Sequence, residues 1–286
     1  MQPLFEHRQR FAGFGSRVLE VEGEGPALAL FHGWADSADT WRRLLAAAGR
    51  RGRAAVAVDL PGFGAADALR PGPVLPQLDR FAAAVVDYAA ASGDPVVLAG
   101  NSLGGAMALR AAELGHQLPV AGVAPIAPAG LDMPRWFDLV ERDPVLRRLL
   151  ALPFPVPRPM LREAVGRVYR TLAFAHPGAV DRQVVAAFTG HHRDRAAVAR
   201  VMETARRVIP ELDHCLHPER VRCPVLLVWG ARDRMVSPRG ARRVLEALPA
   251  ARLELIDDCG HCPQIEAAER LAELLLDFLE PLAAAA

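Results

Sequence analysis

The chain contains no lysine, because all 34 of its basic residues are arginines. It therefore cannot form a Schiff base on a lysine amine or use the lysine of a P-loop. Its 33 acidic residues nearly balance the arginines, which leaves a net charge of +1 and a pI near 7.8. A balance of this kind gives no electrostatic footprint for nucleic acid or an anionic membrane. We therefore expect no nucleic-acid partner.

Long apolar runs are also missing. The first residues, MQPLFEHRQRFAGFG, lack the apolar segment of about 7–15 residues that marks a signal peptide. No run of about 18 apolar residues is present, so we expect no membrane span. Four cysteines in 286 residues do not make a disulfide framework. Together these absences predict a reduced, soluble, cytoplasmic protein whose 51% hydrophobic content is sufficient for one large core, with or without an insertion.

Short apolar segments alternate with segments of helical periodicity along most of the chain. This alternation is typical of βαβ units and predicts an α/β fold with a mostly parallel central sheet flanked by helices. We expect an antiparallel strand at 17–23, followed by buried strands at 26–33, 54–64, 95–102, 119–130, 223–233 and 251–258.

The alternation stops in the middle of the chain. Residues 131–212 contain no buried-strand pattern and are helical, with prolines as in LPFPVPRPM. We interpret them as a helical lid inserted into a core made of residues 1–130 and 213–286. Within this lid, Trp136, Phe137 and the LPFP segment either line an apolar acyl pocket or pack the lid on the core. His191, His192 and Asp194 are expected at a solvated helix end, and we predict no metal site.

The strongest local motif is Gly100-Asn101-Ser102-Leu103-Gly104, which matches the pattern G-x-S-x-G. It joins a buried strand to a helix of small residues, where a sharp turn presents a serine hydroxyl at the carboxyl edge of the sheet. Gly100 and Gly104 are needed because side chains there would collide with the neighbouring strand and helix. The helix N-terminus behind Ser102 favours developing negative charge. The motif therefore predicts Ser102 as a nucleophile.

A serine nucleophile needs a base, and the base needs an acid that orients it. In sheet enzymes of this type the chain order is Ser, Asp or Glu, then His, each after a strand. Asp233 follows the strand at 223–233, and His261 follows the strand at 251–258. We therefore predict that His261 takes the proton of Ser102 and later protonates the leaving group. Asp233 would hold the imidazole tautomer and stabilise the imidazolium.

The oxyanion of such a reaction needs two backbone N–H donors. We expect one from Leu103, directly after the nucleophile, and one from Trp34 in the loop FHGWADS. Gly33 is expected to let the backbone turn inward there, and His32 is expected to have a structural or supporting role.

Five segments of the chain resemble the α/β-hydrolase superfamily, and they occur in the same order. They are His32-Gly33-Trp34, the segment DLPGFG at 59–64, the glycine-rich turn at 100–105, the segment GARD that ends at Asp233, and Gly260-His261. The resemblance covers residues 1–130 and 213–286. It implies an α/β-hydrolase fold with a variable lid over residues 131–212.

The resemblance further implies a serine hydrolase without a cofactor, acting on a small, apolar ester or related acyl substrate. Asn101 before Ser102 is similar to the hydrolases that cleave carbon–carbon bonds in ring-fission products. Those enzymes often have a tryptophan after the catalytic histidine, whereas Cys262 follows His261 here. Carbon–carbon, lactone and thioester cleavage therefore stay open, as does a receptor-like protein that binds a ligand with little turnover.

Other acidic residues compete with Asp233 for the orienting role. Asp132 follows the strand at 119–130, where some members of the superfamily carry the acid, but the GARD segment favours Asp233. Asp257 and Asp258 adjoin the histidine and are interpreted as turn residues. We expect Asp59 to brace the loop after its strand.

The tetrapeptide Cys259-Gly260-His261-Cys262 resembles a disulfide-exchange motif. Such motifs open a helix early in a thioredoxin fold, whereas only one helix is indicated after Cys262. We therefore interpret both cysteines as packing residues, and Gly260 as the residue that frees the backbone so that His261 can turn toward Ser102. A bond between the two cysteines would clamp the His261 loop, so strong oxidation would then impair activity.

Overall fold

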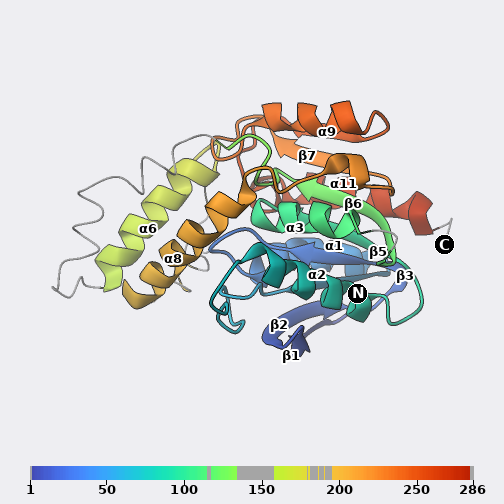
Figure 1. Cartoon of the computed structure of the whole chain (residues 1–286), viewed down its shortest axis with the longest axis horizontal. Coiled ribbons are helices and arrows are strands. Elements are labelled where there is room, and N and C mark those ends of the chain that lie inside the picture. The colour runs from blue at the N-terminus through green and yellow to red at the C-terminus, as the bar shows by residue number, and fades with distance from the viewer. Residues whose placement is uncertain are drawn as a thin grey trace.

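A computed structural model of the chain describes residues 2–114, 117–133, 158–178, 180, 186, 190 and 195–283. Its centre is an eight-stranded sheet with the order β1-β2-β4-β3-β5-β6-β7-β8 (Figure 1). Neighbouring strands from β4 to β8 pair in parallel, and β2 is antiparallel to both of its neighbours. The predicted mostly parallel sheet is therefore confirmed.

The described strands are β1 (Leu4–Phe11), β2 (Phe14–Val21), β3 (Glu24–Phe31), β4 (Arg53–Val58), β5 (Val96–Asn101), β6 (Val120–Ile126), β7 (Leu226–Gly230) and β8 (Arg252–Ile256). The described α-helices are α1 (Arg42–Arg50), α2 (Leu75–Ala89), α3 (Leu103–Ala112), α6 (Arg158–Ala173), α8 (Arg195–Leu212), α9 (Ala241–Ala247), α10 (Pro263–Glu266) and α11 (Ala268–Ala283). Short 3₁₀ helices are η1 (Ala38–Trp41), η2 (Pro218–Arg220) and η3 (Pro238–Gly240).

The N-terminal hairpin contains a strand that the sequence pattern does not predict. Only residues 17–23 are expected to be extended at this end, but β1 also forms and pairs with β2. The hairpin turns through Ala12 and Gly13, whose φ angles of 49° and 84° suit a two-residue turn. Most of β1 is exposed at the sheet edge, so it shows no alternation of apolar and polar residues.

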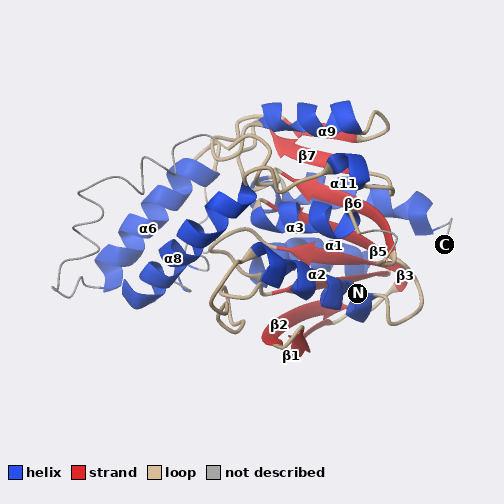
Figure 2. Ribbon diagram, in the orientation of Figure 1, coloured by secondary structure: helices blue, strands red, loops and turns tan. Residues whose placement is uncertain are grey.

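Helices cover both faces of the sheet, so the central strands are buried on two sides (Figure 2). Phe31 of β3 packs in one cluster with side chains of α2, α3 and α9. Its neighbour Leu30 packs in a second cluster with side chains of α1 and α11. Successive residues of a strand point to opposite faces, which explains why these strands are continuous apolar runs.

Two described helices, α6 and α8, lie between β6 and β7 in sequence and extend beyond one end of the sheet (Figure 1). No strand is described between β6 and β7, in keeping with a helical insertion. The exact limits 131–212 stay a prediction. The residues proposed for the acyl pocket or a solvated helix end lie outside the described residues: Trp136, Phe137, the LPFP segment, His191, His192 and Asp194.

Asp59 braces the loops that follow β3 and β4. Its side chain has no exposed surface and accepts hydrogen bonds from Ala38 N and Ala65 N, both at 2.7 Å, and from Arg17 Nε at 3.0 Å. Burial alone would raise the pKa of Asp59, but the hydrogen bonds from Arg17 and from the N–H groups of Ala38 and Ala65 outweigh it and lower that pKa. The carboxylate therefore fixes the start of η1, directly after the loop that contains Trp34.

We predict that replacing Asp59 by Asn lowers the free energy of unfolding by about 3 kcal/mol, as is typical for a broken buried ion pair. Because folding lowers the pKa of Asp59, its contribution is complete above the unfolded value of about 4 and is lost as pH falls through the folded value. Urea unfolding at neutral and acidic pH measures both effects. Arg242→Gln, which breaks an exposed pair with Glu246, serves as the control and should match the wild type. Equal stability of the two variants at neutral pH would contradict the prediction.

Candidate active site

Ser102 stands at the turn between β5 and α3 with a φ of 57° and a ψ of −115°. A non-glycine residue at positive φ costs about 1–3 kcal/mol, and such strain clusters at functional sites. Two hydrogen bonds hold the turn: Ser102 N donates to Ile126 O at 2.9 Å, and Ala129 N donates to Ser102 O at 3.0 Å. The strained residue is therefore fixed at the carboxyl end of β5.

The glycines around Ser102 allow α3 to begin directly against the sheet. A Cβ atom on Gly104 would collide with the carbonyl group of Phe31, and a Cβ atom on Gly100 would collide with the carbonyl group of Gly104. Neither glycine has a positive φ. Both are therefore required by close approach of backbone to backbone.

His261 and Asp233 form a buried hydrogen-bonded pair at the ends of β8 and β7. His261 Nδ1 lies 2.8 Å from Asp233 Oδ2, and the side chains are only 4% and 0% exposed. The other carboxylate oxygen, Asp233 Oδ1, accepts from Met235 N at 2.8 Å and Val236 N at 3.0 Å. Because a carboxylate only accepts, Nδ1 carries the proton and Nε2 is left as the basic nitrogen.

Asn101 connects the end of β5 to the His261 loop. Its Nδ2 donates to the backbone oxygen of His261 at 2.9 Å, and its Oδ1 accepts from Gln264 Nε2 at 3.2 Å. Among the described residues no hydrogen bond joins Ser102 Oγ to the His261 ring. The structure thus brings the two residues onto adjoining, mutually bonded loops, and the predicted Ser–His contact stays a prediction.

The loop after β3 lies directly beside Ser102. A Cβ atom on Gly33 would lie 3.2 Å from Asn101 Oδ1 and 3.4 Å from Ser102 Cβ. Gly33 does not have a positive φ; the residue that does is Ala35, with φ 64°. A side chain at Gly33 would therefore be crowded by Asn101 and Ser102, and the expected inward turn of the backbone at Gly33 stays a prediction. The backbone N–H groups of Trp34 and Leu103 stay predicted oxyanion donors.

His32 is a structural residue of this loop. Its side chain is fully buried, and Leu60 N donates to His32 Nε2 at 2.9 Å. The other ring nitrogen, Nδ1, then donates to Gly33 O at 2.7 Å. The ring therefore ties the loop after β3 to the loop after β4.

The competing acidic residues have other partners. Asp132 is held through its backbone, where its carbonyl accepts from Ser237 N at 2.9 Å. Asp258 has a φ of 58° and pairs at the surface with Arg232 at 2.6 Å and His176 at 2.8 Å. Among these acids, only Asp233 hydrogen-bonds to His261 in the described part of the chain.

The two cysteines beside His261 are buried thiols that face different surroundings. Cys259 is 1% exposed and packs in the cluster of α1 and α11, whereas Cys262 is 4% exposed and packs with Ala173 and Phe174. Burial raises the pKa of Cys259 to about 12 and raises the pKa of Cys262 well above its usual value. Both are therefore protonated at neutral pH, in keeping with packing residues.

Gly260 does not have the role expected of it, which was to free the backbone. Its φ is not positive, so no special backbone freedom is needed to turn the chain. A Cβ atom there would instead meet Ala173 O and Ala175 N, both at 2.7 Å. The glycine is needed because the segment after α6 passes directly over the His261 loop.

Sequence patterns did not indicate a role for three residues in or near the loops that carry Trp34 and His261, namely Asp36, Tyr169 and Glu266. Glu266 accepts hydrogen bonds from Ala175 N and Gly260 N, both at 2.8 Å. Tyr169 lies 3.9 Å from Cys262 Sγ through its hydroxyl oxygen. Burial raises the pKa of Asp36, which follows the loop after β3, to about 7. Ala175 lies 91 positions from Glu266, and Tyr169 lies 93 positions from Cys262, so no local pattern indicates these contacts. The pKa of Asp36 is raised mainly by burial, which only the fold creates.

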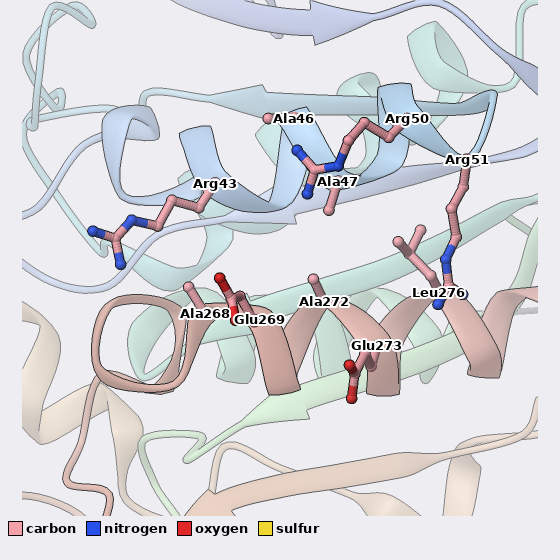
Figure 3. A pocket seen from close by; sticks show the side chains of 10 residues that line it. All are labelled: Arg43, Ala46, Ala47, Arg50, Arg51, Ala268, Glu269, Ala272, Glu273 and Leu276. Carbon is pink, nitrogen blue, oxygen red and sulfur yellow. The ribbon is translucent and has the colours of Figure 1, made fainter. Parts of the chain in front are cut away.

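Other parts of the molecule lie outside this site. A surface groove between α1 and α11 (Figure 3) contains none of the predicted catalytic residues; it is lined by Arg43, Ala46, Ala47, Arg50, Arg51, Ala268, Glu269, Ala272, Glu273 and Leu276. Across the described ranges no group of His, Cys, Asp and Glu is arranged to hold a metal ion. None of the described helices is both long and apolar enough to span a membrane.

Comparison with known proteins gives relatives over nearly the whole chain. The dihydrolipoyllysine-residue acetyltransferase component of the acetoin cleaving system from Pseudomonas putida is 31% identical over 94% of this chain and 68% of its own. The pimeloyl-acyl-carrier-protein methyl ester esterase of Xanthomonas campestris pv. campestris (strain B100) is 27% identical over 92% and 99% of the two chains. A solved membrane phospholipase A, a bacterial virulence factor, has a TM-score of 0.77 at 25% identity, covering 98% of this chain and 86% of its own.

Residues 28–274 match the model of the alpha/beta hydrolase family. This match includes the strand ends that carry Ser102, Asp233 and His261, and it includes the segment that contains α6 and α8. Because it covers most of the chain, we conclude that this protein belongs to the alpha/beta hydrolase family.

Proposed function

We propose that this hydrolase is a serine hydrolase that cleaves an ester or related acyl substrate through an acyl-enzyme. The observation that carries the proposal is the buried bond of 2.8 Å between His261 Nδ1 and Asp233 Oδ2. This bond orients an imidazole whose loop is itself bonded, through Asn101, to the turn that bears Ser102. A base held in this way, on a loop bonded to the turn of a strained serine, supports nucleophilic catalysis by Ser102.

In the proposed reaction Ser102 Oγ attacks the acyl carbon while His261 Nε2 takes its proton. The resulting imidazolium donates from Nδ1 to Asp233, whose second oxygen is already held by two backbone N–H groups. His261 then protonates the leaving group as its bond to the acyl carbon breaks, which leaves the acyl group on Ser102. A water molecule, deprotonated by His261, attacks this acyl-enzyme, and the proton returns to Ser102 Oγ as the acid is released. The contact between Ser102 and His261 is expected to tighten when substrate binds, as is common for catalytic hydrogen bonds.

Negative charge that develops on the acyl oxygen would be stabilised by the N–H groups of Leu103 and Trp34. Two observations support this role. Leu103 is the first residue of α3, where the helix dipole is positive. Trp34 follows Gly33, where an added Cβ atom would lie 3.4 Å from Ser102 Cβ.

An ester is the substrate that relatives favour, because one of them is a methyl ester esterase that aligns over 99% of its length. Carbon–carbon, lactone and thioester cleavage use the same three residues and stay alternatives within the mechanism. We propose that the physiological substrate is a small, apolar acyl compound and that the reaction uses no cofactor. The alternative of another class is a receptor-like protein that binds its ligand with little turnover.

Replacing Ser102 by Ala should reduce hydrolysis of short p-nitrophenyl esters by at least about 10³-fold, because the nucleophile is lost. Ser92→Ala, at an exposed turn, is the matched control and should retain full activity. A fluorophosphonate probe should label the wild type and Ser92→Ala, but not Ser102→Ala. Hydrolysis that survives in Ser102→Ala would disprove the mechanism. A wild type that neither hydrolyses esters nor takes the label would favour the receptor-like alternative.

Replacing Asp233 by Asn should lower kcat by about 10³- to 10⁴-fold, because the imidazole loses the partner that fixes its tautomer. Asp132→Asn provides the comparison, since Asp132 follows β6 and has no hydrogen bond to His261 in the described part of the chain. Its kcat should stay close to that of the wild type in steady-state assays. A larger loss in Asp132→Asn than in Asp233→Asn would show that the orienting acid is misassigned.

The cysteines should be poor nucleophiles in the folded protein. Burial raises the pKa of each of the four thiols, to about 11 for Cys223 and about 12 for Cys259. We therefore expect slow reaction with Ellman's reagent at neutral pH, and rapid reaction of all four after unfolding in guanidinium chloride. Mild oxidation should leave ester hydrolysis unchanged. Rapid formation of a Cys259–Cys262 disulfide, followed by loss of activity, would instead support a redox function.

A further inference from the structure

Glu266 joins two segments that are far apart in sequence but adjacent in the fold. Its carboxyl group accepts from Gly260 N at 2.8 Å, in the His261 loop. It also accepts from Ala175 N at 2.8 and 3.1 Å, just after α6. Two backbone N–H groups from different parts of the chain therefore converge on one partly buried side chain.

The same two segments contact each other directly. His261 N donates to Ala173 O at 2.7 Å, so the proposed base is held through its own backbone by the end of α6. Side chains reinforce this junction: Cys262 packs with Ala173 and Phe174, which are almost fully buried. The end of α6 and the segment after it are thus connected to residues on both sides of His261 in sequence, Gly260 and Cys262.

These hydrogen bonds form a ring that passes through the Glu266 carboxylate. On one side, the Glu266 carboxylate accepts from Gly260 N, directly before His261. On the other side, it accepts from Ala175 N, two residues after Ala173, whose carbonyl accepts from His261 N. Gly260 has no room for a side chain because Ala173 O and Ala175 N would lie 2.7 Å from its Cβ. Removing the carboxyl group would leave two N–H groups without their acceptor at this tight junction, and buried N–H groups without partners are costly.

We propose that Glu266 is a positioning residue that couples the segment after α6 to the placement of His261. It touches no reacting atom and acts through the Gly260 and His261 backbone. This inference rests on the proposed serine hydrolase function, because the group that it positions is the proposed base. It also means that a shift of α6, whose last residue is Ala173, would be transmitted to His261.

The test compares Glu266→Ala and Glu266→Gln with Glu273→Ala. Glu273 is an exposed residue of α11 whose ion-pair partner is Arg270 on the same helix, so its replacement should change nothing measured here. A glutamine keeps the side-chain length and one acceptor oxygen, so it should retain the fold and part of the bonding. Steady-state hydrolysis of p-nitrophenyl esters and amide hydrogen exchange by mass spectrometry are the two measurements.

A misplacement of about 1 Å in a catalytic group can cost about 10²-fold in rate. We therefore expect kcat to fall by about 10- to 100-fold in Glu266→Ala and by less in Glu266→Gln, with KM changed by less than about 3-fold. Amide exchange should accelerate in peptides that contain residues 173–175 and 259–261. Exchange in β5 and β6 should stay as in the wild type.

If amide exchange at residues 173–175 and 259–261 is unchanged in Glu266→Gln, the proposal is overturned. This test remains valid even when Glu266→Ala does not fold. A loss of kcat that accompanies faster exchange throughout the core would likewise overturn it, because the effect would then be general destabilisation. Hydrolysis that survives Ser102→Ala would disprove the proposed function and the catalytic part of this inference. The exchange measurement does not depend on the reaction and tests the junction separately.

Discussion

The close approach of α3 to β3 is the constraint on which the candidate site depends. Because Gly104 has no side chain, α3 begins against the carbonyl group of Phe31, and Ser102 is forced into a φ of 57°. This strain is offset by the buried contacts of β5 and α3, whose residues are almost all buried. The loop after β3 also lies close to the serine, because an added Cβ atom on Gly33 would lie 3.4 Å from Ser102 Cβ. The turn thus places a hydroxyl group, a helix N-terminus and a backbone loop within one small region.

Hydrogen bonds between strand ends then organise the remaining polar groups. Asp233 at the end of β7 bonds to His261 after β8, and Asn101 at the end of β5 bonds to the backbone of His261. These groups are nearly inaccessible to solvent, and burial of unpaired polar atoms is unfavourable. Each bond therefore restricts the positions of its partners, which is how three separate segments form one rigid arrangement. The buried Asp59 has the same function for the loops after β3 and β4.

The helices between β6 and β7 are attached to the very loops proposed to carry the chemistry. Trp34 Nε1 donates to Val201 O of α8 at 3.2 Å, and Glu266 binds the segment after α6 to the His261 loop. In addition, Glu211 of α8 accepts from Val74 N and Leu75 N at the start of α2. These bonds connect α8 to the loop that contains Trp34, and the end of α6 to the loop that contains His261.

Local sequence determined the strand–helix alternation, the glycine-flanked Ser102 and the order of Ser102, Asp233 and His261. These features depend on backbone propensity, on apolar periodicity and on close approach within one turn, and such properties are encoded over a few residues. The exposed strand β1 was missed because it lacks that periodicity. The tertiary structure alone decided why Gly260 must be a glycine, since Ala173 O and Ala175 N leave no room for a Cβ atom. It alone placed Gly33 where a Cβ atom would crowd Asn101 and Ser102. It alone assigned a role to Glu266, because a hydrogen bond across about ninety positions leaves no pattern in the sequence of either partner.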